Sequence, residues 1–138
     1  LLFCEDSIVR GTQLRDIITR VFEHGAREVH MRPACPPLLH GCPFLNFSRS
    51  KSEMDLAARR AIRELEGGES PHLDAYADPA TSRYAAMVEQ IRVRLGLTTL
   101  RYQTLPDMID AIGLPASSLC TYCWDGGQQR PRLPLNGG

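Results

Sequence analysis

Residues 1–12 read LLFCEDSIVRGT and are predicted to decide the fold. The apolar run at residues 1–4 is typical of a buried strand, and the charged pair Glu5-Asp6 marks the point where that strand ends. Open α/β folds bind their ligands outside the carboxyl ends of parallel strands. We therefore expect a ligand site directly after residue 4.

The residues that follow the charged pair suit a phosphate group. Ser7, Gly11 and Thr12 supply hydroxyls and exposed backbone amides, and the next helix adds the positive end of its dipole. Glu5 and Asp6 suit ribose hydroxyls or the waters of a Mg²⁺ ion. The stretch therefore predicts a site for a phosphorylated sugar. The alternative is an ordinary strand–turn–helix with a solvated acidic pair.

The octapeptide EDSIVRGT at residues 5–12 resembles the phosphoribosyl pyrophosphate (PRPP) motif of type I phosphoribosyltransferases. More narrowly, it is similar to the version found in the glutamine PRPP amidotransferase family. That family usually has two aspartates at the start, and here the first is Glu5. The resemblance implies that Glu5 and Asp6 hold the ribose and Mg²⁺. It also implies a loop for the 5-phosphate formed by Ser7, Val9, Arg10, Gly11 and Thr12, in which Arg10 is expected to pack on the loop, with phosphate contact as the alternative.

In this family an N-terminal glutaminase domain frees ammonia from glutamine. The phosphoribosyltransferase domain then places the ammonia on carbon 1 of PRPP, displacing pyrophosphate and giving phosphoribosylamine, the first step of purine synthesis. The chemistry needs the sugar fixed and the pyrophosphate neutralised more than it needs a nucleophile. We therefore expect no catalytic nucleophile in this chain. The resemblance also implies glutamine binding by a domain outside the chain, no glutamine-dependent activity of the chain alone, and a homo-oligomeric full-length enzyme.

The length and composition agree with a single globular domain. The 138 residues carry 16 basic and 16 acidic side chains, so no charge excess favours nucleic acid or an anionic membrane. No apolar run approaches the roughly 20 residues of a membrane span. The chain opens without Met or a basic leader, and we expect a cytoplasmic fragment of a longer polypeptide.

Periodicity predicts an α/β fold in which a parallel sheet is flanked by helices. An amphipathic helix is expected from residue 12, with Thr12 as its N-cap and Gly25 after its end. A second strand is expected at 26–32. With the resemblance, this pattern implies a partial type I phosphoribosyltransferase fold with a helical C-terminal extension. The apolar stripe of the first helix consists of Leu14, Ile17, Ile18, Val21 and Phe22.

The remaining elements follow from the same patterns. A proline-rich loop occupies 33–43, and 72–81 is expected to be a surface insertion without regular structure. Residues 1–127 are assigned to the C-terminal portion of the phosphoribosyltransferase domain, and 128–138 to a disordered tail. Helices are expected at 52–65, 82–95 and 105–113, and a short strand at 97–102.

Five cysteines are present, and two of them form the C-x-x-C pair Cys120 and Cys123. Such a pair is compatible with half a zinc site, a redox dithiol or half an iron–sulfur site. A redox dithiol normally opens a helix after a strand, and this pair lies near the C-terminus instead. Zinc would need two further ligands, for which Cys35 and Cys42 are available.

The resemblance favours a [4Fe–4S] cluster. Cys42 follows the paired proline as in the iron–sulfur members of the family, and Cys120 and Cys123 match the terminal C-x-x-C. The family's fourth ligand lies upstream of residue 1. Cys35 is expected to be structural or a spare thiol, and Cys4 a small core residue. The four histidines show no metal-ligand spacing.

Two rival functions remain open at this point. One is another type I phosphoribosyltransferase, such as a base-salvage enzyme, which shares the loop but has no use for the cysteines. The other is a non-catalytic zinc-binding interaction module in which Glu5 and Asp6 are merely solvated. Iron with acid-labile sulfide would favour the amidotransferase, and stoichiometric zinc would favour the module.

Overall fold

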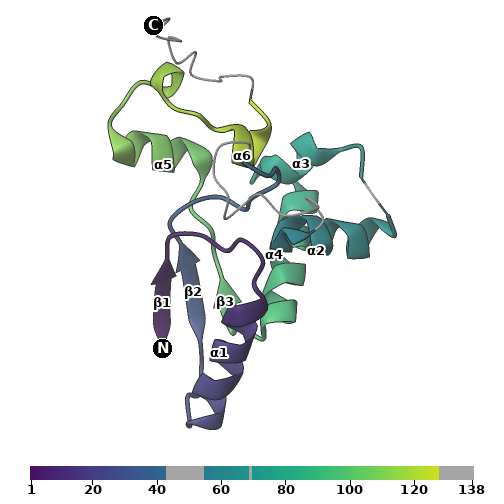
Figure 1. Ribbon diagram of the computed structural model, residues 1–138, viewed down its shortest axis with the longest axis vertical. Coiled ribbons are helices and arrows are strands. Elements are labelled where there is room, and N and C mark those ends of the chain that lie inside the picture. The colour runs from purple at the N-terminus through teal and green to yellow at the C-terminus, as the bar shows by residue number, and fades with distance from the viewer. Residues whose placement is uncertain (43–54, 69, 128–138) are drawn as a thin grey trace, which may run out of the picture.

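The computed structural model describes residues 1–42, 55–68 and 70–127. These residues form a parallel sheet, four longer helices and several short ones (Figure 1). In chain order the elements are β1 (Leu2–Glu5), α1 (Thr12–Glu23), β2 (His30–Pro33), α2 (Ala57–Glu66), α3 (Leu73–Ala77), α4 (Ser82–Leu95), β3 (Thr99–Leu100), α5 (Leu105–Ile112), a 3-10 turn (Ala116–Ser118) and α6 (Tyr122–Asp125).

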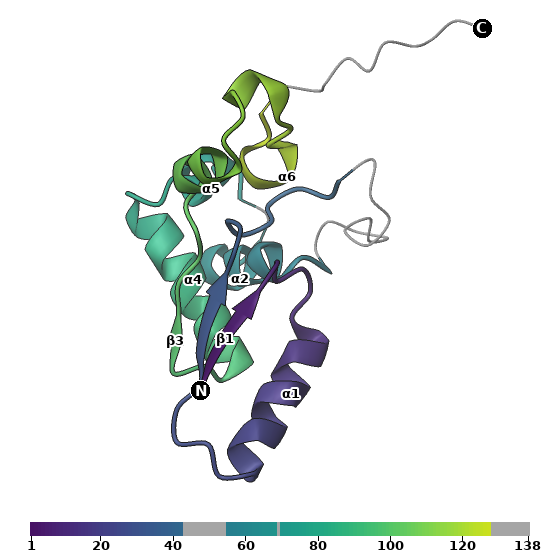
Figure 2. The ribbon, with the colours of Figure 1, turned by 90° about the vertical axis from the view of Figure 1, so that its left-hand side faces the viewer.

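The three strands lie in the order β1-β2-β3, and both pairs are parallel. The predicted α/β class with a parallel sheet is therefore confirmed. The helices α1 and α4 contact each other on one side of the sheet, while α5 and α6 lie beyond its carboxyl edge (Figures 1 and 2). This arrangement leaves the loop after β1 between the sheet edge and α2.

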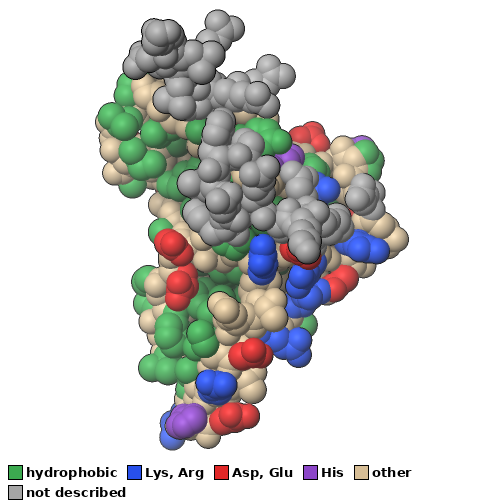
Figure 3. Space-filling view, in the orientation of Figure 1, with side chains coloured by type: hydrophobic (Ala, Val, Ile, Leu, Met, Phe, Trp, Pro, Cys, Tyr) green, Lys and Arg blue, Asp and Glu red, His purple; other side chains and the backbone are tan. Residues whose placement is uncertain are grey.

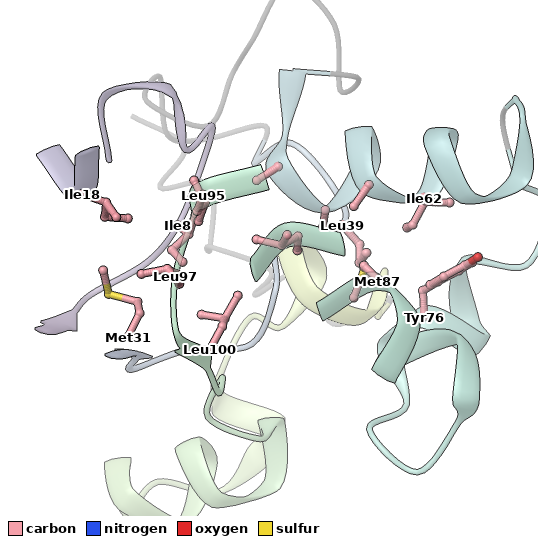
Figure 4. Packing of buried hydrophobic residues seen from close by; sticks show 14 of the residues in the cluster. Ile8, Ile18, Met31, Leu39, Ile62, Tyr76, Met87, Leu95, Leu97 and Leu100 are labelled. Atoms are coloured by element: carbon pink, nitrogen blue, oxygen red, sulfur yellow. The ribbon is translucent and has the colours of Figure 1, made fainter. Parts of the chain in front are cut away.

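The core lies between the sheet and its helices. Phe3, Met31 and Leu100 are aligned across the three strands, and Met31 and Leu100 are buried. The side chains of Ile18 from α1 and Met87 from α4 complete the same cluster (Figure 4). Because strand residues alternate between faces, only every second residue of each strand reaches this cluster.

The prediction of a fully buried first strand is wrong. Leu2 is 63 % exposed and Cys4 is also exposed, so Cys4 is not the expected core residue. Within the described residues, β1 pairs only with β2 and forms one edge of the sheet. The helices cover the face to which Phe3 belongs, which leaves Leu2 and Cys4 on the other face.

The first helix begins one residue away from the expected cap. Gly11, with φ +75°, is the N-cap of α1, and Thr12 is the first helical residue. The N-cap was therefore misassigned, because the loop turns into the helix through a left-handed backbone that glycine adopts without strain. Gly25 does follow the end of the helix, with φ +93°, as predicted.

The prediction that the segment 72–81 lacks regular structure is wrong. It contains α3, and Tyr76 at its centre is only 2 % exposed. The Tyr76 hydroxyl donates to Glu66 Oε1 at 2.6 Å, and the Arg83 guanidinium lies 3.4 Å from the same oxygen. The guanidinium carbon also stands 5.9 Å from the centre of the Tyr76 ring. A single buried tyrosine thus fastens the insertion to α2 and α4, which a search for apolar periodicity misses in so short a helix.

The other helices and strands agree with expectation to different degrees. The helix at 82–95 has the predicted bounds, and that at 105–113 ends one residue earlier. Both later strands are shorter than predicted, because the sheet ladder pairs only 30–33 and 99–100. The described part of the helix predicted at 52–65, the second in the chain, begins at Ala57. Its predicted start at 52–54 and the tail at 128–138 lie outside the described residues.

Across the described residues, no helix combines the length and the apolar character that crossing a membrane requires.

Candidate functional site

A pocket opens at the carboxyl end of β1, where the sequence predicted a ligand site. It encloses about 540 Å³. We call it the loop pocket, because the loop between β1 and α1 forms most of its wall. Its lining consists of Glu5, residues 7–12, and Gln13, Leu14 and Ile17 from the start of α1.

Three contacts hold the loop in place. Ile8 points into the core and is only 4 % exposed (Figure 4). The carbonyl of Val9 accepts a hydrogen bond from the Ala57 amide at 2.8 Å, which ties the loop to the first residue of α2. Behind the loop, Gly11 lies against Leu95 of α4. These contacts fix the loop backbone before any ligand arrives, which is the condition for a preorganised site.

The loop presents backbone amides that have no hydrogen-bond partner among the described residues. Helix α1 has no side-chain cap and no acidic residue in its first turn. Among the described residues, nothing accepts a hydrogen bond from the amides of Arg10, Gly11 or Thr12. The first amides of a helix lack intrahelical acceptors, and the helix dipole favours an anion there. The loop pocket is therefore chemically suited to a phosphate group.

The two carboxylates lie at different positions around the pocket. Glu5 lines it, whereas Asp6 accepts a hydrogen bond from the Ser7 amide at 2.6 Å. The Asp6 carboxylate is also close enough to Cys35 to act on that thiol electrostatically. Both carboxylates are exposed, so their oxygens remain accessible to hydroxyl groups or to a hard cation such as Mg²⁺. Of the predicted site residues, Glu5, Ser7, Val9, Arg10, Gly11 and Thr12 thus line one pocket, whereas Asp6 is not among its lining residues.

The three cysteines predicted as ligands lie near one another, in the loop after β2 and in the segment around α6. Cys42 is buried, and Cys120 and Cys123 are half-buried. Burial raises the pKa of Cys123 to about 12, with further contributions from a hydrogen bond to Cys42 and from the charges of Cys42 and Cys120. The fold therefore makes neighbours of thiols that are almost 80 residues apart in the sequence.

Backbone contacts join the two segments that carry these cysteines. The amides of Leu39 and His40 both donate to the carbonyl of Cys123, at 2.8 and 3.0 Å. The rings of His40 and Tyr122 lie 5.3 Å apart. In the described part of the chain, no three or more histidine, cysteine, aspartate or glutamate side chains have an arrangement that would hold a metal ion. The three thiols are of the chemical type that binds iron or zinc, and they influence one another electrostatically, but the described residues do not hold them in the arrangement of a metal site.

The other two cysteines, Cys35 and Cys4, differ in exposure. Cys35 is buried, and burial raises the pKa of its thiol, while the neighbouring Trp124 indole acts in the opposite direction. Cys4 is exposed on β1.

Sequence reasoning missed the residues that support the loop from behind. Ile8 lay inside the motif but was not assigned a role, and nothing in the sequence marked Ala57 or Leu95 as its neighbours. Ile8 offered one local signal, because an isoleucine between a serine and an arginine in a surface loop indicates an anchor in the core. The contacts to α2 and α4 depend on how the helices pack.

The comparisons with known proteins bear on this geometry. No family model matches the chain. The amidophosphoribosyltransferase of Methanothermobacter thermautotrophicus is 28 % identical over 131 residues, covering 95 % of this chain and 22 % of that protein. The amidophosphoribosyltransferase of Mycobacterium tuberculosis is 33 % identical over 127 residues, covering 91 % and 20 %. Over nearly its whole length, the chain is similar to the amidophosphoribosyltransferases.

Solved structures give the same result. The glutamine PRPP amidotransferase from B. subtilis, in complex with ADP and GMP, superimposes with a TM-score of 0.65 at 26 % identity, covering 95 % of this chain and 24 % of that one. A structure of the allosteric regulatory enzyme of purine biosynthesis gives 0.62 at 26 % identity. The fold is therefore that of one part of the PRPP amidotransferases. The chain spans about a fifth of the length of its curated amidophosphoribosyltransferase relatives.

Proposed function

We propose that the chain supplies the PRPP-binding loop of an amidophosphoribosyltransferase. One observation carries the proposal: in the loop pocket, the amides of Arg10, Gly11 and Thr12, which have no partner among the described residues, lie beside the exposed carboxylate of Glu5. A ligand that satisfies both must present a phosphate next to hydroxyl groups, as a phosphorylated ribose does. The similarity to amidophosphoribosyltransferases supports PRPP as that ligand.

Each part of the pocket has its own task in the proposed reaction. The loop amides and the Ser7 and Thr12 hydroxyls would hold the 5-phosphate. Glu5 and Asp6 would hold the ribose hydroxyls, and their oxygens fit a Mg²⁺ ion, which would neutralise the pyrophosphate leaving group. Ammonia then attacks carbon 1 of the ribose as the bond to pyrophosphate breaks. The chain's contribution is to fix the sugar while positive charge develops on it.

The remainder of the activity is proposed for the rest of the enzyme. Ammonia would come from glutamine, released by a glutaminase domain of the kind implied for this family, and the full-length enzyme would be a cytoplasmic homo-oligomer. Residues 1–127 would be the C-terminal portion of its phosphoribosyltransferase domain. The chain by itself would then consume no glutamine, and glutamine-dependent activity of the isolated chain would contradict this assignment.

We also propose that Cys42, Cys120 and Cys123 bind a [4Fe–4S] cluster. The proximity of the three thiols, from the proline loop and the segment around α6, supports this assignment. When bound, the cluster would crosslink these two segments through thiolate bonds to iron. Detection of iron and acid-labile sulfide in the purified protein would support the cluster. Stoichiometric zinc would instead favour a zinc-binding module, for which three thiols and one further ligand suffice.

The test of the PRPP site is a titration of Mg²⁺–PRPP into isotopically labelled protein. We expect saturable shifts of the backbone amides of Ser7, Gly11 and Thr12. Asp6→Asn should weaken binding by about tenfold or more, because it removes a charge from the ribose and metal ligands. Asp16→Asn, an exposed carboxylate on α1, is the matched control and should leave the affinity unchanged. The absence of shifts in folded protein would contradict the proposal.

The PRPP titration and the metal analysis together also test the alternative of a base-salvage enzyme. A salvage phosphoribosyltransferase would bind Mg²⁺–PRPP in the same way but would contain no iron or sulfide. The two measurements together therefore distinguish an amidotransferase, a salvage enzyme and a zinc module.

A further inference from the structure

The residues next to Asp6 form a continuous layer at the carboxyl edge of the sheet. Pro33 of β2 is paired with Glu5 of β1, and the amide of Ala34 donates to the Glu5 carbonyl at 2.8 Å. Cys35 follows directly and is only 7 % exposed. The backbone ladder therefore carries the buried Cys35 side chain to the end of β1, where Asp6 lies.

Helix α6 closes this layer. The amides of Leu39 and His40 donate to the Cys123 carbonyl, which fixes α6 against the loop that carries Cys35. The next residue is Trp124, the only tryptophan of the chain. Its indole Nε1 atom is buried, and among the described residues nothing accepts a full hydrogen bond from it. Buried donors without an acceptor are costly and rare, because each has lost its bonds to water.

The Cys35 sulfur is the neighbour that the indole and the Asp6 carboxylate share. Burial raises the pKa of Cys35, the Trp124 indole opposes this rise, and the charge of Asp6 adds to it. The sulfur therefore keeps its proton at neutral pH. A thiol can donate to a carboxylate while its sulfur accepts weakly from an N–H group, and each contact in such a chain polarises the next.

The carboxylate of Asp6 has little else to hold it. Figure 3 shows acidic side chains on the surface at the carboxyl end of β1, below the apolar side chains of α5. In the described part of the chain, Asp6 accepts one hydrogen bond, from the Ser7 amide, and forms no ion pair. An exposed side chain with one local bond keeps several rotamers, and fixing one of them before the ligand arrives saves entropy on binding.

We propose that Cys35 and Trp124 are positioning residues for Asp6, and that α6 thereby supports the sugar-phosphate site from behind. Neither side chain lines the loop pocket, so both act through the carboxylate rather than on the ligand. This role rests on the proposed binding of ribose and Mg²⁺ by Asp6. The C-terminal part of the chain then contributes to the affinity for the sugar phosphate through two buried side chains.

The first test needs no ligand. Because Trp124 is the only tryptophan, isotopically labelled protein gives a single indole Nε1–H signal in NMR. Asp6→Asn removes the charge beside Cys35 and should shift this signal. Asp16→Asn, at an exposed position on α1, is the control and should leave the signal in place. An indole signal that is unchanged in Asp6→Asn would overturn the link between Asp6 and Trp124.

Two variants of Cys35 separate positioning from packing. Cys35→Ser keeps a hydrogen that can be donated to Asp6 but loses apolar volume, whereas Cys35→Val keeps apolar volume but cannot donate. We expect Cys35→Val to weaken Mg²⁺–PRPP binding by about fivefold or more, and Cys35→Ser to bind within about twofold of the wild type. Urea unfolding should rank the two variants the other way, with the serine variant the less stable. Affinity that follows stability would instead assign Cys35 a packing role only.

Trp124→Phe tests the other end of the layer. It keeps an aromatic ring but removes the N–H group, and it should weaken Mg²⁺–PRPP binding by about twofold to threefold. Cys4→Val, at an exposed position on β1, is the control for both sites and should bind as the wild type does. Metal content is measured for each variant, because Trp124 is adjacent to Cys123, and it should be unchanged.

The outcomes distinguish the positioning role from the PRPP site itself. Folded wild-type protein that does not bind Mg²⁺–PRPP contradicts the proposed function and the positioning role with it. Binding that is weakened by Asp6→Asn but unchanged in Cys35→Val and Trp124→Phe overturns the positioning role and leaves the PRPP site intact. If Cys35→Val does not fold, the affinity of Trp124→Phe and the indole signal of Asp6→Asn decide.

Discussion

Gly11 lies directly against Leu95, so that a Cβ atom built on Gly11 would stand 3.0 Å from Leu95 Cδ2. The contact joins the loop after β1 to the last turn of α4. Leu95 is itself buried, with 5 % of its surface exposed. The backbone of Gly11 has φ +75°, a conformation that residues with a Cβ rarely adopt. Two separate physical reasons therefore require glycine at this position.

Gly11→Ala should destabilise the protein by about 2–3 kcal/mol. About 1–2 kcal/mol of this comes from the left-handed backbone and the rest from displacing Leu95. Gly25→Ala is the matched control, because Gly25 has φ +93° but nothing within 4 Å of the added Cβ. Gly25→Ala should therefore lose only the roughly 1–2 kcal/mol that comes from the left-handed backbone. Urea unfolding measures both variants, and equal losses would show that the contact with Leu95 costs nothing. Gly11→Ala should also weaken Mg²⁺–PRPP binding, which Gly25→Ala should not.

Tyr76→Phe should lower the free energy of unfolding by about 1 kcal/mol, because it removes a buried hydrogen bond to a charged acceptor. The ring remains, so the packing of α3 should be preserved. Arg83 stays beside Glu66 and limits the loss. Tyr122→Phe is the control, since the described residues give the Tyr122 hydroxyl no hydrogen bond. An unchanged urea midpoint for Tyr76→Phe would contradict the role of this bond in fastening the insertion.

The same tyrosine should make stability sensitive to high pH. Burial, followed by the hydrogen bond and charge of Glu66, raises the pKa of Tyr76 from its ordinary value of 10.0 to about 12. The folded state therefore holds this proton more tightly than the unfolded state does. The resulting stability is fully present below pH 10.0 and is lost as the pH rises to about 12.

Urea midpoints measured at about pH 9 and about pH 11 test this expectation. The wild type should lose stability between the two, and Tyr76→Phe should lose less. Burial also raises the pKa of Tyr84 and of Tyr102, so part of the slope should remain in the variant. A slope identical to that of the wild type would show that Tyr76 does not contribute.

The cysteines should differ in metal binding. Cys42→Ser should abolish or strongly reduce the binding of iron and sulfide, or of zinc, because it removes one of three neighbouring thiols. Cys4→Ser, at an exposed position on β1, should leave the metal content unchanged. Metal analysis of the two purified variants, reconstituted under the same conditions, gives the comparison. Equal metal content would show that the three thiols are not a ligand set.

The sequence predicted those features that depend on neighbouring residues. The bounds of α4 followed from a 3.6-residue period, and the end of α1 followed from Gly25. The loop after β1 was also predictable, because its small residues and its place between a strand and a helix are both local properties. The C-x-x-C pair was visible for the same reason. Local spacing alone did not show that Cys42 joins it, and the family resemblance supplied that expectation.

Tertiary structure decided which faces of these elements are covered. The apolar run at residues 1–4 has the same appearance in a central strand and in an edge strand, so its exposure depends on which strands pair beside it. Tyr76 is buried because Glu66 and Arg83, from α2 and α4, meet its hydroxyl and its ring. Arg15, Arg60 and Arg94 line one small pocket although they come from three different helices, and no spacing in the sequence relates them. Local pattern fixes the type of an element, whereas packing between distant segments fixes what each side chain meets.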